Sequence, residues 1–323
     1  MSEVAPPHLL LGADVGGTAT RVAVATAGGE VLGVAAGPAG NPNSVGPEES
    51  ARRVRAAAEQ CLARVGEGAA ERVVAAVIGL AGGARADDAY LTATRPAGLP
   101  VQPRLVSDLA VAFSSATPAP RGYVLVAGTG AVAGRIDAGE LRERRDGWGW
   151  LLGDEGSGYW LGREAVRDTL TQLQSGTPSL GALAAAVVER LGTRDPVAVV
   201  QACYAQPPVW LSTFAELVAR HADDPAAISI AHRAAGHLVH LLVDLAPAPD
   251  QPVVLAGSVA TRPGPVREAL WARLDAALDN PRLTAESGLV GALWLATGEA
   301  FAVDDTVHGR LARSIGRTSG TLV

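Results

Sequence analysis

The amino-acid sequence predicts an α/β protein made of two duplicated domains. Runs of alternating apolar residues, joined by a glycine-rich turn, open the chain, and the same order of elements begins again near residue 122. Hydrophobic residues make up 48% of the chain but aromatic residues only 4%, so the core must consist mainly of closely packed Ala, Val and Leu. A length of 323 residues exceeds the usual size of a single core, which favours two medium-sized domains.

The first half contains a three-stranded meander, then a helix and two further strands. Turn residues at Gly16-Gly17 and Gly28-Gly29 separate the strands of the meander. The first helix has apolar residues at helical spacing, with Pro47 at its start and Gly66 after its end. The predicted strands are 8–13, 21–26, 30–36, 71–83 and a short one from 103 to Ser107-Asp108, and the predicted helices are 47–65 and a second one after Asp108.

The second half repeats the arrangement of strand, glycine turn and strand over 122–141. The segment 116–122, ATPAPRG, contains two prolines, and we expect it to join the two domains. Helical patterns then dominate 158–246, and one late buried strand is expected within 251–260. The duplication is weak in sequence identity but clear in the order of elements.

These elements predict the domain boundaries. We expect the first domain to cover 1–115, completed by a helix near 288–300, and the second domain to cover 116–287. The last segment, 301–323, is polar and rich in Gly and Arg. It is expected to form a loosely held tail.

Composition argues against several classes of partner. The net charge is −6, and the chain contains no basic run with interleaved aromatic residues, so nucleic acid is not an expected partner. The two cysteines, Cys61 and Cys203, are too far apart for a CxxC pair, which indicates a reducing compartment. The N-terminus lacks a basic leader with a long apolar run, and no apolar stretch is long enough for a membrane span. We therefore expect a soluble, cytoplasmic protein that does not bind membranes.

Two glycine-rich turns are the candidate anion sites, because the usual GxxxxGK[ST] loop is missing. Glycines let backbone amides approach a phosphate closely, and a threonine adds a hydroxyl donor. The second turn also resembles a dinucleotide-binding loop, but that motif needs a following helix, and the pattern here continues as a strand. The residues of the two turns are Asp14, Gly16, Gly17 and Thr18 in the first, and Gly128, Thr129 and Gly130 in the second.

One further stretch, 147–162, reads GWGWLLGDEGSGYWLG and holds three of the six tryptophans of the chain. It also contains the adjacent acidic pair Asp154 and Glu155 among six glycines. On composition alone, this stretch reads as a loop with an unusual concentration of tryptophans, and the acidic pair reads as part of a turn.

These motifs, in this order, resemble those of the superfamily of actin, hexokinase and heat-shock chaperone ATPases. The residues that carry the resemblance are Asp14-Val15-Gly16-Gly17-Thr18, Ser107-Asp108, Ala127-Gly128-Thr129-Gly130, Val254-Leu255-Ala256-Gly257-Ser258 and Gly288-Leu289-Val290-Gly291-Ala292, and they cover about 10 to 296. The GWG…GDEGS…YW stretch is most similar to the N-acetylglucosamine kinase branch, which includes actinobacterial glucosamine kinases. The resemblance implies two ribonuclease H-like, actin/hexokinase-type domains with a cleft between them.

The resemblance also implies roles in phosphoryl transfer. Asp108 would be the general base for the acceptor hydroxyl, although the start of a helix is equally a place for an N-cap aspartate. Asp14 would hold Mg²⁺ through water, although an Asp before glycines is otherwise an ordinary turn residue. The two glycine turns would hold the phosphates of ATP, and Gly257 and Ser258 would lie beside the nucleoside.

For the sugar, the resemblance implies contacts from Asn41, Asp108, Thr129, Gly147 and Asp154. Asn43 is close enough to Asn41 to be confused with it, and both have turn propensity. Asp154 would bridge two ring hydroxyls, because a carboxylate can accept both hydrogen bonds in a fixed geometry. Glu155 would either face a 2-amino group or cap the helix that begins near Gly158.

The predicted activity is therefore an ATP- and Mg²⁺-dependent transfer of phosphate to the 6-hydroxyl of glucosamine, giving glucosamine 6-phosphate. The acidic pair favours glucosamine because it suits a free ammonium. N-acetylglucosamine is the alternative acceptor. A regulatory ATPase of the same fold would need closely spaced cysteines for an iron–sulfur cluster, and a sugar-responsive repressor would need a preceding helix-turn-helix. A homodimer is common in this branch and is expected here.

Overall fold

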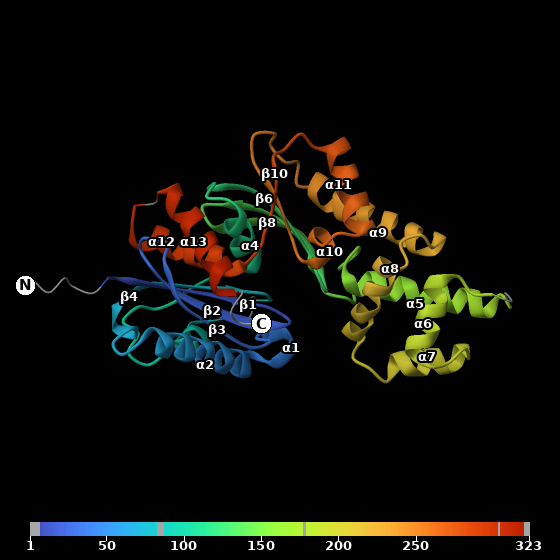
Figure 1. The fold of residues 1–323 in the computed structure, drawn as a ribbon, viewed down its shortest axis with the longest axis horizontal. Coiled ribbons are helices and arrows are strands. Elements are labelled where there is room, and N and C mark those ends of the chain that lie inside the picture. Colours follow the sequence, from blue (N-terminus) through green and yellow to red (C-terminus); the bar gives the residue numbers. More distant parts are fainter. Residues whose placement is uncertain (1–6, 83–86, 177–178, 303, 320–323) are drawn as a thin grey trace, which may run out of the picture. The chain divides into compact units, whose positions relative to one another are not determined.

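The computed structural model describes residues 7–82, 87–176, 179–302 and 304–319 (Figure 1). The first six residues, residue 83 of the expected fourth strand, and residues 303 and 320–323 of the expected tail lie outside the described parts. The chain divides into two compact units. Unit 1 comprises Met1–Gly122, Ile136–Arg142 and Ala285–Val323, and unit 2 comprises Tyr123–Arg135 and Glu143–Thr284.

Unit 1 is built on a five-stranded sheet with the order β3-β2-β1-β4-β5. The first three strands form an antiparallel meander, whereas β4 pairs in parallel with β1 and β5 in parallel with β4. β1 and β4 have nearly continuous buried residues, as expected of strands covered on both faces. The strands are β1 (Leu9–Val15), β2 (Ala19–Thr26), β3 (Val31–Pro38), β4 (Val73–Leu80) and β5 (Arg104–Ser107).

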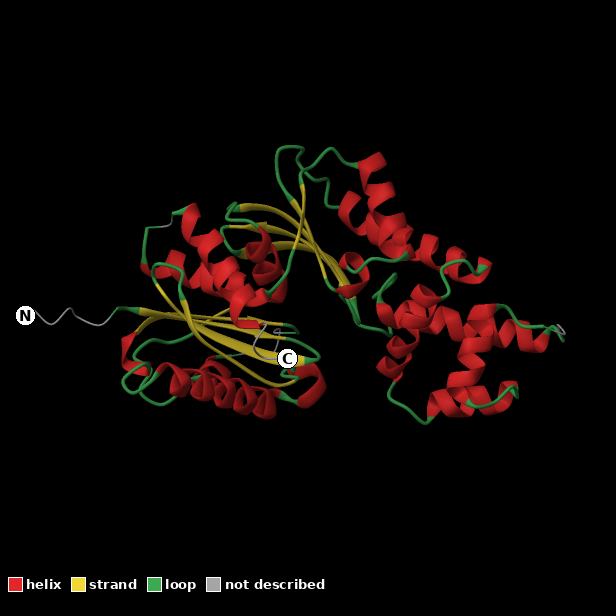
Figure 2. Ribbon diagram, in the orientation of Figure 1, coloured by secondary structure: helices red, strands yellow, loops and turns green. Residues whose placement is uncertain are grey.

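Helices cover both faces of this sheet (Figure 2). Helix α2 (Pro47–Val65) lies on one face and packs against β2 and β3. Helices α4 (Asp108–Ala116) and α12 (Gly288–Ala300) lie on the other, where α12 packs against β1 and β4. The approach is so close that a Cβ on Gly12 would lie 2.8 Å from the backbone nitrogen of Leu293. The remaining short helices of the unit are α1 (Pro42–Val45), η1 (Ala70–Arg72) and α3 (Asp88–Thr94).

The expectation of a loosely held tail was wrong, because the last described segment forms a packed helix, α13 (Asp305–Ser319). Val307, Leu311 and Ile315 lie one turn apart along it and are buried. The ring nitrogen Nε2 of His308 lies 2.8 Å from the carbonyl oxygen of Ser114, and Ser314 Oγ accepts a hydrogen bond from the backbone of β3. The tail is a further covering helix of unit 1.

Unit 2 repeats the sheet. Its strand order is β10-β9-β6-β7-β8, so the first to fifth strands of this half occupy the same relative places as β1 to β5. β6 pairs in parallel with β9, as β1 does with β4. β9 pairs in parallel with β10, as β4 does with β5. The strands are β6 (Arg121–Ala127), β7 (Ala131–Asp137), β8 (Glu140–Asp146), β9 (Val253–Ala256) and β10 (Arg282–Thr284).

The helices of unit 2 share one hydrophobic core with this sheet, built from residues such as Leu125, Phe214 and Leu238. Helix α9 is long and apolar enough to cross a membrane by length and composition alone. Seven of its residues are nevertheless buried within the unit, so α9 is a core helix. The helices are α5 (Gly158–Gln174), α6 (Ala182–Leu191), α7 (Pro196–Tyr204), η3 (Pro208–Phe214), α8 (Ala215–Arg220), α9 (Pro225–Val243), α10 (Ser258–Thr261) and α11 (Pro265–Ala277).

The α/β fold with two duplicated sheets confirms the predicted fold class.

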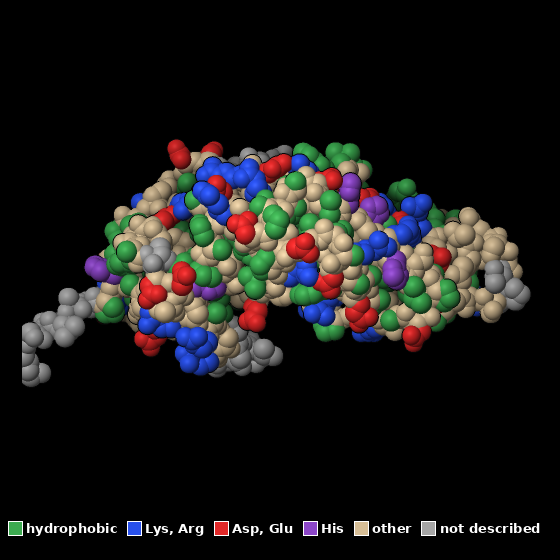
Figure 3. Space-filling view, turned by 90° about the horizontal axis from the view of Figure 1, so that it is seen from above, with side chains coloured by type: hydrophobic (Ala, Val, Ile, Leu, Met, Phe, Trp, Pro, Cys, Tyr) green, Lys and Arg blue, Asp and Glu red, His purple; other side chains and the backbone are tan. Residues whose placement is uncertain are grey.

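All 27 basic side chains other than histidine are arginine. Acidic and basic side chains are interspersed over the face drawn in Figure 3. Several are paired, as in Arg53 with Glu49 at 2.6 Å and Arg121 with Asp137 at 3.1 Å.

Candidate active site

Asp14 is the next-to-last residue of β1 and approaches the first residue of α12. A Cβ on Gly288 would lie 2.5 Å from Asp14 Oδ2, so this contact requires glycine. Among the described residues, no hydrogen bond joins the Asp14 carboxylate to a partner, and burial raises its pKa against the opposing effect of Arg21. A desolvated carboxylate without an internal donor suits a cation ligand, so the residue fits the predicted role at Mg²⁺.

The turn that follows Asp14 is closed by a hydrogen bond of 3.0 Å from Gly16 N to the carbonyl oxygen of Ala19. Gly17 and Thr18 are exposed at its tip. Gly40 N also donates to the carbonyl oxygen of Gly16. The turn is therefore fixed at its base from two sides, while its tip is open to a ligand.

Asp108 lies where β5 ends and α4 begins. The N-cap residue of α4 is Ser107, whose Oγ accepts a hydrogen bond of 3.1 Å from Leu109 N. Asp108 is the first helical residue, and its Oδ1 accepts a second hydrogen bond, 3.0 Å long, from the same amide. Burial, and then the charge of Asp14, raise the pKa of Asp108 to about 6. Asp14 and Asp108 thus form one acidic site in unit 1.

Asn41 and Asn43 lie together in the loop after β3. Asn41 caps the short helix α1, and its Oδ1 accepts a hydrogen bond of 2.9 Å from Asn43 N. Both side chains approach Gly82, where a Cβ would lie 2.4 Å from Asn43 Nδ2 and 2.8 Å from Asn41 Oδ1. The cap commits Asn41 Oδ1 and leaves its amide nitrogen as the available donor.

The glycine turn of unit 2 joins β6 to β7 and docks on the start of α5. Gly128 N donates to the carbonyl oxygen of Gly130 at 2.9 Å, which closes the turn. The carbonyl oxygens of Gly128 and Thr129 accept hydrogen bonds of 2.7 and 3.1 Å from Gly158 N and Tyr159 N, the first amides of α5. Thr129 itself is exposed. The helix therefore holds the turn by its carbonyl groups.

The predicted sugar residues Gly147 and Asp154 meet at the backbone of Ala131, the residue after that turn. Gly147 N donates to the carbonyl oxygen of Ala131 at 3.1 Å, and Asp154 Oδ1 accepts from Ala131 N at 3.1 Å. A Cβ on Gly130 would lie 2.9 Å from both carboxylate oxygens of Asp154, so the carboxylate sits directly against the turn. Burial raises the pKa of Asp154.

Glu155 does not cap α5, because Ser157 does so by accepting a hydrogen bond from Trp160 N. The Glu155 carboxylate instead lies 3.6 Å from Arg163 and 3.8 Å from His237. It faces two groups that already supply positive charge or hydrogen-bond donors.

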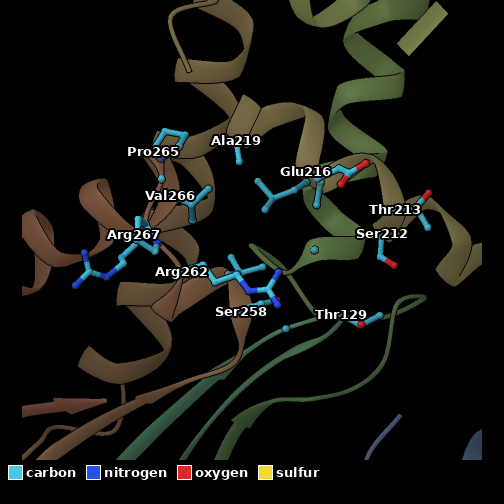
Figure 4. A pocket seen from close by; sticks show the side chains of 17 residues that line it. Thr129, Ser212, Thr213, Glu216, Ala219, Ser258, Arg262, Pro265, Val266 and Arg267 are labelled. Carbon is cyan, nitrogen blue, oxygen red and sulfur yellow. The ribbon is translucent and has the colours of Figure 1, made fainter. Parts of the chain in front are cut away.

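A cavity of about 490 Å³ lies in unit 2 between the glycine turn, α8, α10 and α11 (Figure 4). Thr129 and Ser258 line one side, and Glu216 lies on another. Gly257 before Ser258 has a left-handed φ of 83°, and a Cβ there would lie 2.4 Å from the carbonyl oxygen of Ala127. The cavity has the size of an ordinary ligand pocket.

Sequence reasoning missed the arginines of this cavity. Arg262 extends its guanidinium into the pocket, whereas Arg267 points away and stacks on Trp271 (Figure 4). No ion pair joins Arg262 to another described side chain. A sequence feature that could have indicated Arg262 is the Arg-Pro-Gly-Pro turn, shortly after the predicted nucleoside residues Gly257 and Ser258.

A family model described as the BadF/BadG/BcrA/BcrD ATPase family matches residues 11–296. The chain belongs to this family.

Two curated relatives are kinases of amino sugars. The N-acetylmuramic acid/N-acetylglucosamine kinase of Clostridium acetobutylicum is 32% identical over 165 residues, 50% of this chain and 53% of that protein. The N-acetyl-D-glucosamine kinase of Dictyostelium discoideum is 28% identical over 173 residues, 50% of this chain and 54% of that protein. The chain spans about half the length of the curated relatives that it matches.

Among solved structures, a Chromobacterium violaceum protein provisionally assigned as an N-acetylglucosamine kinase superposes with a TM-score of 0.74. It is 26% identical, and the match covers 90% of this chain and 99% of that one. The likeness extends through both units.

Proposed function

We propose that this protein is an ATP-dependent kinase that phosphorylates the 6-hydroxyl of N-acetylglucosamine. The observation that carries the proposal is Asp108, a carboxylate at a helix start whose pKa is raised to about 6. A general base works best when its pKa lies near the working pH. A surface aspartate with an ordinary pKa would be a weaker acceptor for the proton of a sugar hydroxyl.

In the proposed reaction, the sugar O6 forms a bond to the γ-phosphorus of ATP while the bond from that phosphorus to the β–γ bridging oxygen breaks. Asp108 takes the hydroxyl proton, and ADP leaves with the electron pair. Mg²⁺, when bound, neutralises phosphate charge, and Asp14 is the residue of this chain that would hold it. The exposed amides of the two glycine turns are suited to the phosphate oxygens.

Unit 2 offers the nucleotide site. Its cavity begins at Gly128 and Thr129, where phosphates would lie, and continues past Ser258 into an apolar space lined by Val259 and Val266. Arg262 brings a positive charge into this space without an internal partner among the described residues. The turn offers amides to the phosphates, and the pocket beyond it offers apolar, cationic and acidic groups (Val266, Arg262 and Glu216) to the nucleoside.

Two findings favour N-acetylglucosamine over glucosamine. Both curated relatives are named for kinase activity on N-acetylated sugars. The argument for glucosamine rested on Glu155 as a partner for an ammonium, but Arg163 and His237 already lie beside that carboxylate. An ammonium there would have to displace them.

The cysteines do not support a cluster-bearing ATPase. Cys61 is fully buried in unit 1, and burial raises its pKa to about 12, whereas Cys203 lies in unit 2. Iron–sulfur ligation requires thiolates gathered at one place. Because burial disfavours its thiolate, Cys61 is a poor candidate for a cluster ligand.

The test is a coupled assay of ADP formation with ATP and Mg²⁺ and one acceptor at a time: N-acetylglucosamine, glucosamine, N-acetylmuramic acid or glucose. We expect the highest kcat/KM with N-acetylglucosamine, and a product whose phosphate is on O6 by NMR. Faster turnover with glucosamine would reverse the choice of acceptor. ATP hydrolysis unaffected by any of the four sugars would overturn the kinase proposal.

A further inference from the structure

Asp146, which the sequence motifs did not include, closes the loop that carries the proposed sugar residues. It is the last residue of β8, immediately before Gly147. Its Oδ1 accepts hydrogen bonds from Trp148 N at 3.3 Å and from Asp154 N at 2.9 Å, and its Oδ2 accepts one from Glu155 N at 3.3 Å. One carboxylate thus bridges both ends of the loop.

Two ring contacts also hold this loop: the Trp150 ring lies 6.0 Å from the Tyr159 ring, and the Arg144 guanidinium lies 4.8 Å from the Trp148 ring. Trp148, Leu151 and Leu152 are 64%, 72% and 79% exposed, so hydrophobic burial does not hold the tip. Within the loop, Gly149 accepts backbone hydrogen bonds at its carbonyl oxygen from Leu152 N and Gly153 N. A Cβ on Gly153 would lie only 1.9 Å from Asp146 Oδ1, so the chain passes as close to the carboxylate as glycine allows. Among the described residues, Asp146 is the side chain that accepts hydrogen bonds from amides at both ends of the loop.

Hydrogen bonds connect Asp146 to Asp154, the proposed sugar contact, and to the glycine turn. The Asp146 carboxylate accepts a hydrogen bond from the backbone amide of Asp154, and the Asp154 carboxylate accepts one from the backbone amide of Ala131, just after the glycine turn. Asp154 is itself left-handed, with a φ of 60°. A left-handed aspartate needs surrounding constraints to stay in that conformation, and the hydrogen bond from its amide to Asp146 is one of them.

The backbone of Asp146 indicates that its carboxylate has a purpose beyond the turn. Its φ is 59°, a conformation that glycine adopts at lower cost. The hydrogen bond from Trp148 N is one that an aspartate accepts in an ordinary turn, but those from Asp154 N and Glu155 N come from eight and nine residues away. The carboxylate compensates for the backbone strain by satisfying three amides, two of which belong to Asp154 and Glu155.

We propose that Asp146 is a positioning residue for the acceptor sugar: its carboxylate fixes Asp154 against the glycine turn, so that the free oxygen of Asp154 is presented to the sugar hydroxyls. This inference rests on the proposed function of the site. Asp146 does not contact the sugar itself, and it acts through Asp154.

The test is calorimetric titration with N-acetylglucosamine, and separately with a non-hydrolysable ATP analogue and Mg²⁺, on wild type, Asp146→Gly, Asp146→Asn and Ala246→Gly. Asp146→Gly removes the anchor and relieves the backbone, and we expect sugar affinity to fall about 10- to 100-fold, with nucleotide affinity within about twofold of wild type. Asp146→Asn keeps an acceptor oxygen for the amides of Trp148 and Asp154, so its loss should be smaller.

Ala246→Gly is the matched control, because Ala246 is another left-handed residue of unit 2, with a φ of 47°. It relieves the same kind of strain away from the loop, and both affinities should stay at wild-type values. Thermal unfolding of each variant checks that it folds. If Asp146→Gly does not fold, Asp146→Asn carries the test alone.

A pH series separates positioning from general loosening. Burial, and also the charge of Asp146, raise the pKa of Asp154. Asp146→Asn removes that charge, so the loss of sugar affinity at acidic pH should move to a lower pH than in wild type. A merely structural effect would weaken binding equally at every pH.

The outcomes distinguish the two proposals. Wild type that binds no N-acetylglucosamine overturns the proposed function and this inference with it. Wild type that binds the sugar, with Asp146→Gly and Asp146→Asn binding it equally well, overturns the inference alone. Equal losses of sugar and nucleotide affinity in Asp146→Gly would do the same.

Discussion

The two units share one sheet plan but carry different chemistry. In each, a central first strand of seven residues ends in a glycine turn closed by one backbone hydrogen bond, from Gly16 in unit 1 and from Gly128 in unit 2. The sixth residue of that strand is Asp14 in unit 1 and Val126 in unit 2. The duplicated backbone provides the same open turn twice, and the side chains beside it decide what each turn can do.

Unit 1 places two carboxylates near its turn, close enough for the charge of Asp14 to raise the pKa of Asp108. Unit 2 has a neutral residue at the corresponding strand position, a cavity containing Arg262, and a loop anchored by Asp146. The carboxylate beside the turn of unit 2, Asp154, comes from the loop after β8 rather than from the strand before the turn. Proton transfer and metal binding belong to unit 1, and nucleotide and sugar recognition mainly to unit 2, in the function that we propose.

The largest effect should come from Asp108→Asn in unit 1. Turnover should fall about 10²- to 10⁴-fold because the base is lost, while nucleotide affinity stays near wild type. The variant should also be more stable by about 1–3 kcal/mol at pH 7, since it removes a carboxylate whose ionised form burial disfavours. Steady-state kinetics and denaturant unfolding measure both quantities.

Asp88→Asn is the control for this variant, because Asp88 is also the first residue of a short helix in unit 1 and is exposed. It should leave turnover unchanged. If Asp108→Asn kept near wild-type turnover, Asp108 would not be the general base. The proposed division of roles between the two units would then be wrong.

The next effect concerns α13, the last described helix of unit 1. Leu311 is fully buried, and Leu311→Ala should destabilise the protein by about 2–5 kcal/mol through lost burial and the cavity left behind. Val197→Ala, on a 63% exposed side chain of α7 in unit 2, should stay within about 0.5 kcal/mol. Urea unfolding measures both. Equal stabilities would mean that α13 is not part of the folded unit.

A smaller effect is the pH dependence of turnover. Because the pKa of Asp108 is about 6 in the folded, ligand-free protein, kcat/KM should fall about tenfold for each pH unit below that value, as the base becomes protonated. Stability should change in the opposite direction. The folded protein binds this proton more tightly than the unfolded chain does, so the contribution of Asp108 falls as pH rises from about 4 to about 6. An acid limb of kcat/KM centred near pH 4 would exclude the raised pKa.

Periodicity predicted β1 to β7, β9, α2 and the strand-to-helix junction at Asp108, because each of these patterns extends over several neighbouring residues. It did not predict the charged strand β8 or the three-residue strand β10. The tail escaped prediction because only one apolar residue per turn of α13 is buried, beside the polar His308 and Ser314, and Gly309 and Gly316 weaken the helical pattern. Burial at that spacing is visible only when the surface that it meets is known.

The candidate site was predictable only where its contacts are local. Gly147 and Asp154 were identified from one stretch of sequence, but Asp146 just before that stretch was not, since accepting three amides depends on how the loop returns. The partners of Glu155 were not predicted either, because they also depend on how distant parts of the chain fold together. Arg163 is two turns along α5, and His237 comes from α9, far away in the sequence.

The smallest effect should come from Glu155→Gln in unit 2, and it decides how that unit distinguishes its acceptors. Glu155 lies beside Arg163 and His237, so neutralising it should change the ratio of kcat/KM for N-acetylglucosamine to that for glucosamine by less than about threefold. Glu143→Gln is the control, since Glu143 pairs with Arg135 and Arg145 in the same unit. A selective loss of glucosamine turnover in Glu155→Gln, absent from Glu143→Gln, would show that this carboxylate faces a 2-amino group during turnover. The acceptor preference of unit 2 would then depend on a charge, as the acidic pair first suggested, rather than on the shape of the loop that Asp146 anchors.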